Sequence, residues 1–383
     1  MPDGIIYLDG NSLGAMPNDA PERVARTVAR EWGEDLITSW IKHGWIDWPQ
    51  RLAARLAPIV GAGEDELLVC DSTSVNLFKL VAAVIAKSER RVILTEEGNF
   101  PTDLYVADGI AALFPDVELR RVPRAEIERA LGTDVALLML THVDYRSGWR
   151  HHMAALNAAA WDCGALSLWD LSHSAGAMRI DLAASGADLA VGCGYKFLNG
   201  GPGAPAWLFV RRDLQDKLAN PIAGWMGHAR PFDFDGHYAP ATGIKRFLSG
   251  TPPVIGLAAL EAGLATFEGV SIEAVERKAA ALGDFLIAAV AQVASEVRLA
   301  SPPIGHERGA HVVFEHAHAY GIVQALIGRG VIGDYREPGL VRFGLAPLTT
   351  RYEDVWRAAA TLADVLDSEA YLDERFAERA AVT

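Results

Sequence analysis

The chain has 383 residues, of which 50% are hydrophobic and 22% are charged, a composition typical of a well-packed globular protein. At this length an α/β chain commonly forms one large and one smaller domain. The net charge of −14 argues against a nucleic-acid partner, because such partners select for a basic surface. No apolar run reaches the length of a membrane span, since charges or Gly and Pro interrupt each one.

The cysteines and the first residues bear on the compartment. Cys70, Cys163 and Cys193 lie far apart in the chain and form no CxxC pair. The start, "MPDGIIYLDGNSLG", has neither a basic segment nor a long apolar one. We therefore expect a cytoplasmic protein in a reducing environment. Each thiol is explained more simply as a small buried hydrophobe than as a reactive group.

The first two thirds of the chain alternate predicted strands and helices. In "DSTSVNLFKLVAAVIAKS" the apolar residues fall at helical spacing. Strands are predicted at 67–70, 90–97, 117–123, 134–143, 165–172, 187–193 and 204–211, and helices at 71–88, 99–114, 125–131, 152–164 and, as a short segment, after residue 172. Such alternation with short connections predicts an α/β domain with a mostly parallel sheet flanked by helices on both faces.

The pattern changes near residue 257. A long helical stretch through residue 297 is followed by a predicted strand, a helix, a second strand and a final helix. This order predicts a smaller α+β C-terminal domain. We place the large domain at 1–256 and the small domain at 257–383, and residues 1–30 are able to pack with the small domain.

Three strands of the predicted sheet end in residues that can do chemistry, and ligands gather at the carboxyl ends of such strands. Ser72 and Thr73 directly precede a helix, where hydroxyls cap the helix or, with its free N–H groups, bind a phosphate. Capping alone is the more common outcome. Asp170 closes an apolar strand, and this position equally suits a helix cap. Lys196 follows the apolar run "ADLAVGC", although lysine is among the residues least often buried.

These three features together indicate one cofactor. A lysine in an apolar pocket has a lowered pKa and can form a Schiff base. A buried carboxylate on the neighbouring strand can hold a pyridine nitrogen protonated, which makes the ring an electron sink. A helix N-terminus with hydroxyls can bind the phosphate of the same molecule. The pattern therefore predicts pyridoxal 5′-phosphate (PLP), bound through Lys196.

An ordered set of motifs resembles the kynureninase family over nearly the whole chain. The motifs are "YLDGNSLG" (7–14), "STSVNLFK" (72–79), "NFPTDLY" (99–105), "THVDYRSG" (141–148), "WDLSHSAGA" (169–177), "GYKFLNGGPG" (194–203), "GWMGH" (224–228) and "VIGDYREP…VRFG" (331–344). The resemblance implies a PLP enzyme of the aspartate-aminotransferase superfamily, a homodimer with active sites at the subunit interface. The implied reaction belongs to tryptophan catabolism and cleaves the Cβ–Cγ bond of L-kynurenine, giving anthranilate and L-alanine. 3-Hydroxykynurenine is a second candidate substrate.

The resemblance also implies a role for each matching residue. Lys196 matches the Schiff-base lysine, Asp170 the partner of the pyridine nitrogen, and Arg342 the arginine that binds the α-carboxylate of the substrate. Phe100 stacks on the ring, within the motif that also supplies Pro101, Thr102 and Asp103. The phosphate-side contacts are Ser72, Thr73, Tyr195 and, from across the dimer interface, Trp225 and Thr251, while Thr141 and His173 border the cofactor. Tyr195 is either the proton shuttle or a phosphate ligand without proton chemistry.

Other functions remain as alternatives. A cysteine desulfurase or selenocysteine lyase needs a nucleophilic cysteine in the second domain, but no cysteine follows Cys193. A non-catalytic PLP-binding regulator on this fold usually carries a DNA-binding domain, and no basic helix-turn-helix segment precedes the predicted sheet. An aminotransferase uses the same cofactor and arginine, and it is the main alternative. No metal is expected, because the histidines at 311, 316 and 318 lack ligand spacing such as HExxH.

Overall fold

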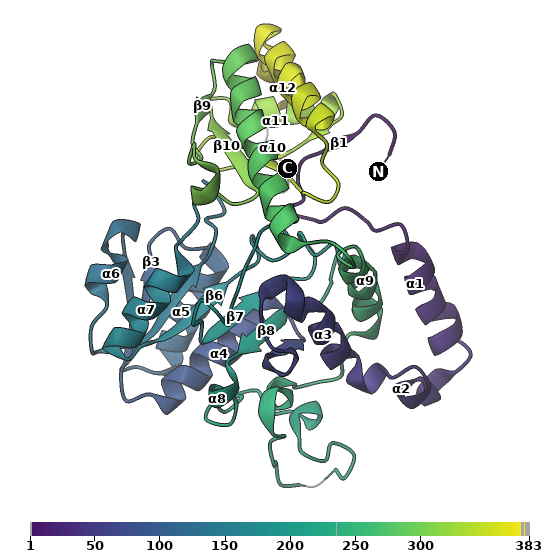
Figure 1. Cartoon of the computed structure of the whole chain (residues 1–383), viewed down its shortest axis with the longest axis vertical. Helices are drawn as coiled ribbons and strands as arrows, with labels where there is room; N and C mark the ends of the chain where they lie inside the picture. The colour runs from purple at the N-terminus through teal and green to yellow at the C-terminus, as the bar shows by residue number, and fades with distance from the viewer. Residues whose placement is uncertain (1, 235, 377–378, 380–383) are drawn as a thin grey trace.

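A computed structural model describes residues 2–234, 236–376 and 379 (Figure 1). The remaining residues of the two predicted domains (1, 235, 377–378 and 380–383) lie outside the described part. A large sheet with helices on both sides forms the lower part of the view in Figure 1, and a smaller unit built on α10, α11 and α12 lies above it. The α/β fold class with a C-terminal α+β unit is thereby confirmed.

The strands have between two and seven residues. They are β1 Ile6–Tyr7, β2 Leu67–Val69, β3 Val92–Glu96, β4 Glu118–Val122, β5 Val135–Thr141, β6 Leu166–Asp170, β7 Leu189–Gly192, β8 Trp207–Val210, β9 Arg298–Leu299, β10 His311–Glu315, β11 Val331–Ile332, β12 Asp334–Arg336 and β13 Leu340–Gly344.

The α-helices connect and cover these strands. They are α1 Ala20–Arg26, α2 Ser39–Lys42, α3 Trp48–Val60, α4 Thr73–Lys87, α5 Pro101–Leu113, α6 Ile127–Ala130, α7 Met153–Cys163, α8 Arg212–Gln215, α9 Val254–Ala265, α10 Ile272–Val293, α11 Ala319–Gly328 and α12 Tyr352–Asp367. A π-helix, η1, covers Thr27–Trp32, and 3₁₀ segments cover η2 Leu36–Thr38, η3 Trp45–Asp47, η4 Glu64–Glu66, η5 Arg124–Glu126, η6 Trp225–Gly227, η7 Gly243–Phe247, η8 Gly305–Glu307, η9 Ala370–Leu372 and η10 Glu374–Phe376.

The central sheet has seven strands in the order β2-β8-β7-β6-β5-β3-β4. Strands β7, β6, β5, β3 and β4 pair in parallel, whereas β8 pairs antiparallel with both of its neighbours. The register places Thr141 at the end of β5 opposite Asp170 at the end of β6. The carboxyl ends of the parallel strands therefore bring these two side chains to one edge of the sheet, as ligand sites in such folds require.

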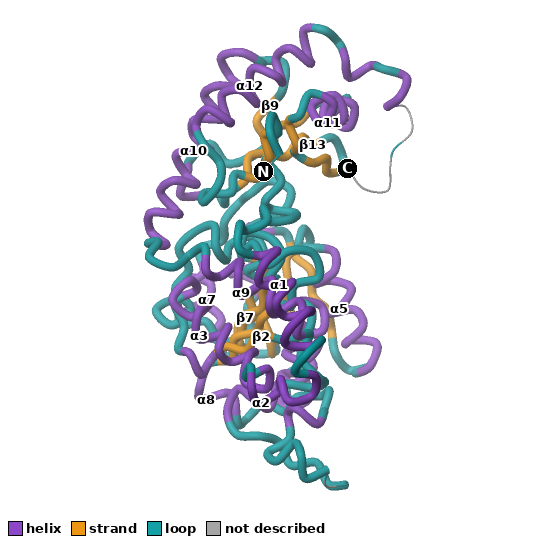
Figure 2. The backbone as a smooth tube through the Cα atoms, turned by 90° about the vertical axis from the view of Figure 1, so that its right-hand side faces the viewer, coloured by secondary structure: helices purple, strands orange, loops and turns teal. Residues whose placement is uncertain are grey.

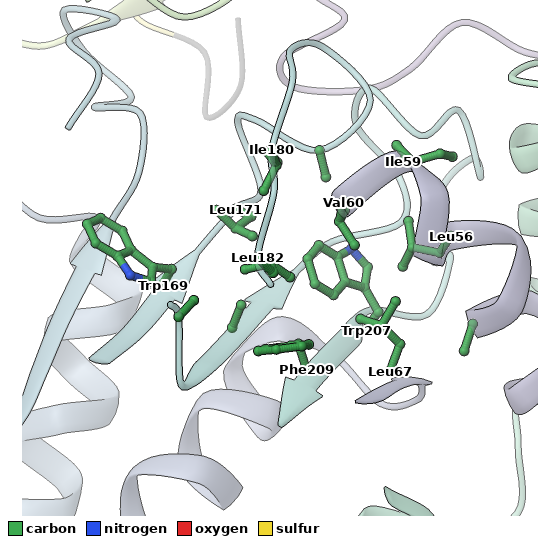
Figure 3. Close-up of a cluster of buried hydrophobic side chains, with 14 of the residues drawn as sticks. Leu56, Ile59, Val60, Leu67, Trp169, Leu171, Ile180, Leu182, Trp207 and Phe209 are labelled. Carbon is green, nitrogen blue, oxygen red and sulfur yellow. The ribbon is translucent and has the colours of Figure 1, made fainter. Parts of the chain in front are cut away.

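Alternate residues of each strand pack into different layers, because successive side chains point to opposite faces of a sheet. Leu138 and Leu140 of β5 pack in one apolar cluster with α3, α7 and α9. Leu137 and Met139 pack in another cluster with α4 and α5. Figure 3 shows part of the first cluster, where Trp207 lies among side chains of α3, β2 and the segment after β6. Both faces are covered, which explains why the strands read as continuous apolar runs.

The small unit has its own core and sheet. Its four strands, in the order β12-β13-β10-β9, are antiparallel, and α10, α11 and α12 cover them with buried apolar side chains. Strand β1, near the start of the chain, pairs in parallel with β11, whereas Leu257, Leu260 and Leu264 of α9 belong to the core of the large sheet. The division of the chain between residues 256 and 257 stays a prediction.

Two sequence-based expectations differ from the structure. No helix forms between β6 and β7, because Gly176 has a φ of +83°, in the left-handed region that a right-handed helix does not use. The predicted long helix after residue 257 is divided in two. Gly269 has a φ of +72°, and Ser271 caps α10 by accepting a hydrogen bond from Ala274 at 3.2 Å, as a serine at a helix start does.

Candidate active site

Lys196 lies in the loop that follows β7, within the glycine-rich segment, and only 8% of its surface is exposed. Its Nζ is 2.9 Å from Nε2 of His173, and it lies 5.6 Å from the centre of the Phe100 ring. Burial, followed by the charge of Lys196, lowers the pKa of His173 well below its usual range. His173 is therefore neutral and can accept a hydrogen bond from the lysine amine.

Two buried carboxyl groups lie close to Lys196. Burial is the main cause that raises the pKa of Asp103, and the neighbouring Asp170 raises it further while Lys196 opposes the shift. Burial also raises the pKa of Asp170, opposed by its hydrogen bond from Ser172 and by Lys196. The Ser172 N–H donates to Asp170 Oδ1 at 2.8 Å and orients the carboxyl group. Strongly perturbed acids beside a buried lysine are typical of functional sites.

Asn99 joins the start of α5 to the end of β5. Its amide oxygen accepts hydrogen bonds from the backbone N–H of Phe100 at 2.8 Å and of Thr141 at 3.2 Å. The Thr141 hydroxyl lies within hydrogen-bond distance of that oxygen and 3.1 Å from Oδ2 of Asp103. Asn99 therefore fixes Phe100, Asp103 and Thr141 relative to one another. Pro101 and Thr102, in the first turn of α5, are half-buried beside them.

The N-terminus of α4 provides the predicted phosphate seat. Ser72 is the N-cap, and its hydroxyl accepts a hydrogen bond from the N–H of Val75 at 3.4 Å. The backbone N–H groups of Thr73 and Ser74 have no acceptor among the described residues, as expected for the first turn of a helix. Capping and anion binding are therefore both available at this helix end.

Tyr195 precedes the lysine and is half-buried. Its ring centre lies 5.9 Å from the Lys196 amine. Burial raises the pKa of its phenol well above the usual value, and Cys193 and Asp170 add to the effect. The phenol is therefore protonated at neutral pH and is available as a hydrogen-bond donor or an acid.

Arg342 of β13 is buried and held by several partners. Its Nε donates to Oδ1 of Asp334 at 2.7 Å, and its Nη2 donates to Oδ2 of the same carboxylate. Nη1 donates to the carbonyl of Tyr145 at 2.6 Å, and Nη2 also lies 3.1 Å from the hydroxyl of Ser12. Burial opposes ionisation of Asp334, but its hydrogen bond and attraction to Arg342 lower its pKa overall. Asp334 thus fixes the plane of the guanidinium.

His311, on β10, was considered from the sequence only as a metal ligand, and the structure places it in this site. Its ring centre is 5.6 Å from that of His173, and Nε2 lies 3.1 Å from the carbonyl of Asp144. Burial, with Arg342 next, lowers its pKa to about 3. Nδ1 of each histidine is buried without a hydrogen-bond partner among the described residues. Asn99 and Asp334 lie inside quoted motifs but were given no role from the sequence, and His311 lies outside those motifs.

Trp225 and Thr251 are the predicted residues that the described chain does not bring to Lys196. Trp225 of η6 instead contacts the rings of Phe232 and Phe234, and Thr251 is exposed. No hydrogen bond or ring contact within the described residues joins either of them to the lysine. Within one subunit, these two positions are separate from the cluster around Lys196.

A cavity of about 1020 Å³ lies beside this cluster, lined among others by Arg124, Trp149 and Arg150. None of the sequence-predicted cofactor residues lines it. Its arginines already have carboxylate partners, since Arg124 lies 2.9 Å from Glu96 and Arg150 lies 2.6 Å from Glu276. The cluster around Lys196 is therefore the candidate active site, because it holds the sequence-predicted residues. The described residues contain no group of three or more His, Cys, Asp or Glu side chains suited to a metal ion.

The cluster fits PLP in its chemistry. The buried amine of Lys196 suits an aldehyde, and a buried carboxyl suits a pyridine nitrogen. The His173 nitrogen that has no partner among the described residues suits a polar ring substituent. The N–H groups at the start of α4, which have no acceptor among the described residues, suit a phosphate. None of the helices in the described residues combines the length and apolarity that crossing a membrane requires.

Solved structures with a similar fold include cysteine desulfurases and a cystine C-S lyase. The apo structure of a cysteine desulfurase from Thermococcus onnurineus NA1 has a TM-score of 0.81 at 19% identity and covers 95% of each chain. A mutant of the cystine C-S lyase C-DES, with glycine covalently linked to its PLP cofactor, has a TM-score of 0.82 at 19% identity, covering 94% of this chain and 97% of the other. At this identity the likeness shows the fold alone.

The sequence relatives are more specific. The model of the kynureninase C-terminal domain matches residues 275–362. Kynureninase from Burkholderia mallei (strain SAVP1) is 48% identical over 392 residues, covering 100% of this chain and 94% of the relative. Kynureninase from Pseudomonas fluorescens is 47% identical with the same coverage. The sequence-based identification is thereby confirmed, and the chain belongs to the kynureninase family.

Proposed function

We propose that this chain is a PLP-dependent enzyme that hydrolyses L-kynurenine to anthranilate and L-alanine by cleaving the Cβ–Cγ bond. The observation that carries the proposal is the buried Lys196 amine, 2.9 Å from a neutral histidine and beside two buried carboxyls, in a chain with full-length similarity to kynureninases. PLP, when bound, supplies an electron sink for the charge that develops on the substrate.

The residues around Lys196 divide the work of holding the cofactor. Lys196 is the anchoring amine and, once free, the base that takes the proton from the substrate Cα. Asp170 is the partner of the pyridine nitrogen, because a buried carboxyl with a raised pKa gains stability as an anion when a cation lies beside it. Phe100 covers the ring face, and the N–H groups of α4 with Ser72 and Thr73 bind the phosphate.

Tyr195 is the candidate proton shuttle for cleavage. Water adds to the ketone carbon of the substrate, the Cβ–Cγ bond breaks, anthranilate leaves with the new carboxyl group, and Cβ gains a proton. A phenol that remains protonated at neutral pH and lies near the lysine amine can donate that proton.

Arg342 is the candidate ligand of the substrate α-carboxylate. Its Nε–Nη2 edge is occupied by Asp334. The Nη1–Nη2 edge, which donates to the Tyr145 carbonyl and the Ser12 hydroxyl, is therefore the edge that can turn to a carboxylate. Two parallel hydrogen bonds from this edge would neutralise the α-carboxylate and orient an amino-acid substrate.

We infer that the enzyme is a homodimer whose active sites lie at the subunit interface. Trp32, Ile37 and Ile41 are 58%, 76% and 79% exposed, and large exposed apolar side chains gathered on one segment are typical of an interaction surface. Trp32 and Ile37 lie between α1 and α2, and Ile41 lies in α2; Figure 2 shows both helices on the face turned to the viewer. A partner subunit would also allow Trp225 and Thr251 to reach a phosphate that they do not reach within one chain.

The fold similarity to desulfurases does not favour that activity. Cys193 is the last cysteine of the chain, it is buried, and burial raises the pKa of its thiol. A nucleophilic cysteine needs a lowered pKa and access to the substrate. Aminotransferase activity remains the alternative, and an assay must distinguish it from kynurenine hydrolysis.

The experiment combines cofactor absorbance with product detection. Purified protein is incubated with PLP, its spectrum is recorded, and L-kynurenine is added while anthranilate fluorescence is followed. We expect a cofactor band that Lys196→Ala abolishes, anthranilate formation that requires Lys196, and no change in the control Lys87→Ala, because Lys87 is exposed at the end of α4. A cofactor band without anthranilate would favour an aminotransferase, and the absence of any band would refute PLP binding.

A further inference from the structure

We propose that Lys79 is a positioning residue for the cofactor phosphate, acting through Asp71 on the turn that precedes α4. This inference rests on the proposed role of Ser72 and Thr73 as phosphate ligands and adds the device that orients them. Lys79 itself is not placed in contact with the phosphate.

Lys79 lies in the second turn of α4 and has no exposed surface. Its Nζ donates to the carboxylate of Asp71 and to the carbonyl of Phe247 at 2.7 Å. Side chains of a helix lean toward its N-terminus, so the lysine stem reaches back to the residue before the cap. A fully buried ammonium is costly unless it is paired and hydrogen-bonded, and here both acceptors meet that requirement.

Asp71 adopts a backbone conformation that needs such support. Its φ is +50°, in the left-handed region that residues other than glycine occupy only when their surroundings stabilise it. The Asp71 carbonyl accepts a hydrogen bond from the N–H of Ala206 at 2.9 Å, and the Cys70 N–H donates to the Ala206 carbonyl at 2.9 Å. Asp71 is thus held by its backbone, which bonds to Ala206 before β8, and by its side chain, which bonds to Lys79.

The orientation of the free N–H groups depends on this turn. Asp71 directly precedes Ser72, and the N–H groups of Thr73 and Ser74 have no acceptor in the part of the chain that the structure describes. Loss of Lys79 would free the Asp71 carboxylate and let its φ relax, which would turn these donors away from a bound phosphate. Because Lys79 and Asp71 neutralise each other, the effect acts through geometry and not through attraction of the phosphate to the ammonium.

A comparison of two cofactor forms isolates this role. Apo-protein is titrated with PLP and, separately, with pyridoxal, which has the same aldehyde and ring but no phosphate, while the absorbance of the lysine-bound form is followed. For Lys79→Met we expect the Kd for PLP to rise about tenfold or more, since several charge-assisted hydrogen bonds weaken. The Kd for pyridoxal should stay within about threefold, because its contacts lie elsewhere. The matched control is Lys87→Met on the same helix, where both constants should stay unchanged.

The ratio of the two dissociation constants decides the outcome. If Lys79→Met weakened PLP and pyridoxal by the same factor, or weakened neither, the inference would be wrong. If that variant does not fold, Asp71→Asn replaces it, because Asp71 is half-buried and asparagine tolerates the left-handed region. A PLP-selective loss in Asp71→Asn supports the inference, and an unchanged ratio overturns it. Wild-type protein that bound PLP no more tightly than pyridoxal would refute the phosphate seat itself and this inference with it, whatever its activity on kynurenine.

Discussion

Replacing Asn99 by alanine should destabilise the apo-protein and weaken PLP binding together. The Asn99 amide oxygen accepts from the N–H groups of Phe100 and Thr141, and its amide nitrogen donates to the Thr95 hydroxyl at 3.0 Å. The Thr141 and Thr95 contacts join Asn99 to β5 and β3, the Phe100 contact holds the residue before α5, and Asp103 lies on that helix. Their loss frees the segment that carries two of the proposed cofactor contacts.

The magnitude follows from the donors left without a partner. An unsatisfied buried polar group costs about 1–3 kcal/mol, and this cost applies fully to the N–H of Thr141, which is buried. Phe100 is only half-buried, so its N–H recovers part of the loss from water. We expect Asn99→Ala to lower the free energy of unfolding by about 2–4 kcal/mol.

The assay is equilibrium urea unfolding of the apo-protein, followed by tryptophan fluorescence, together with a PLP titration. The control Thr95→Val removes one of the two acceptors of the Asn99 amide nitrogen, so its expected loss is about 1 kcal/mol, with PLP affinity nearly unchanged. The reasoning is refuted if Asn99→Ala is as stable as the wild-type protein, or if the Thr95 variant loses as much stability and affinity.

Three further outcomes test individual residues. Tyr195→Phe should lower kcat by about 10²–10⁴ and leave PLP affinity unchanged, whereas a rise in the PLP Kd at normal kcat would make Tyr195 a phosphate ligand only. Arg342→Lys should raise KM for L-kynurenine about tenfold or more, because one ammonium cannot replace a bidentate fork; an unchanged KM would place the α-carboxylate elsewhere. Burial raises the pKa of Asp103 in the folded protein. The protonated carboxyl therefore adds its full contribution to the free energy of unfolding below the unfolded-state pKa of about 3.9, and this contribution is lost as pH rises through the folded-state pKa. The stability of apo Asp103→Asn relative to the wild-type protein should therefore increase between pH 5 and pH 8 in urea unfolding, and a decrease would contradict the assigned burial.

The sequence predicted the residues that a parallel sheet brings together by rule. Asp170 ends β6 and Lys196 follows the neighbouring strand β7, so the carboxyl ends of adjacent parallel strands account for both. Ser72 caps α4 after β2, which is separated from β7 by β8. The kynureninase motifs added names and roles to these positions. Apolar runs also predicted the strands of the sheet closely, because strands buried on both faces need no polar alternation.

The contacts that escaped prediction join residues that are far apart in the sequence. Ser12 and Arg342 are 330 residues apart, and His311 and Asp144 are 167 apart. No periodicity within one segment encodes such a contact, since it depends on how segments far apart in the sequence pack together. Asn99 escaped for a different reason: it lies inside a quoted motif, but an asparagine before a helix is more often a cap than a link between two elements.

The buried charged groups around the proposed PLP site differ in whether a partner within the chain satisfies them. Lys79 with Asp71 and Arg342 with Asp334 are matched pairs, so each pair is satisfied without a ligand and serves to orient its neighbours. Asp103, by contrast, has a pKa raised by burial, and His173 keeps a buried nitrogen without a partner in the described chain. Folding leaves such groups uncompensated at a cost in stability. We propose that this cost would be recovered on binding of a cationic ring with polar substituents, so that the residues that destabilise the apo-protein would provide affinity and orientation for PLP.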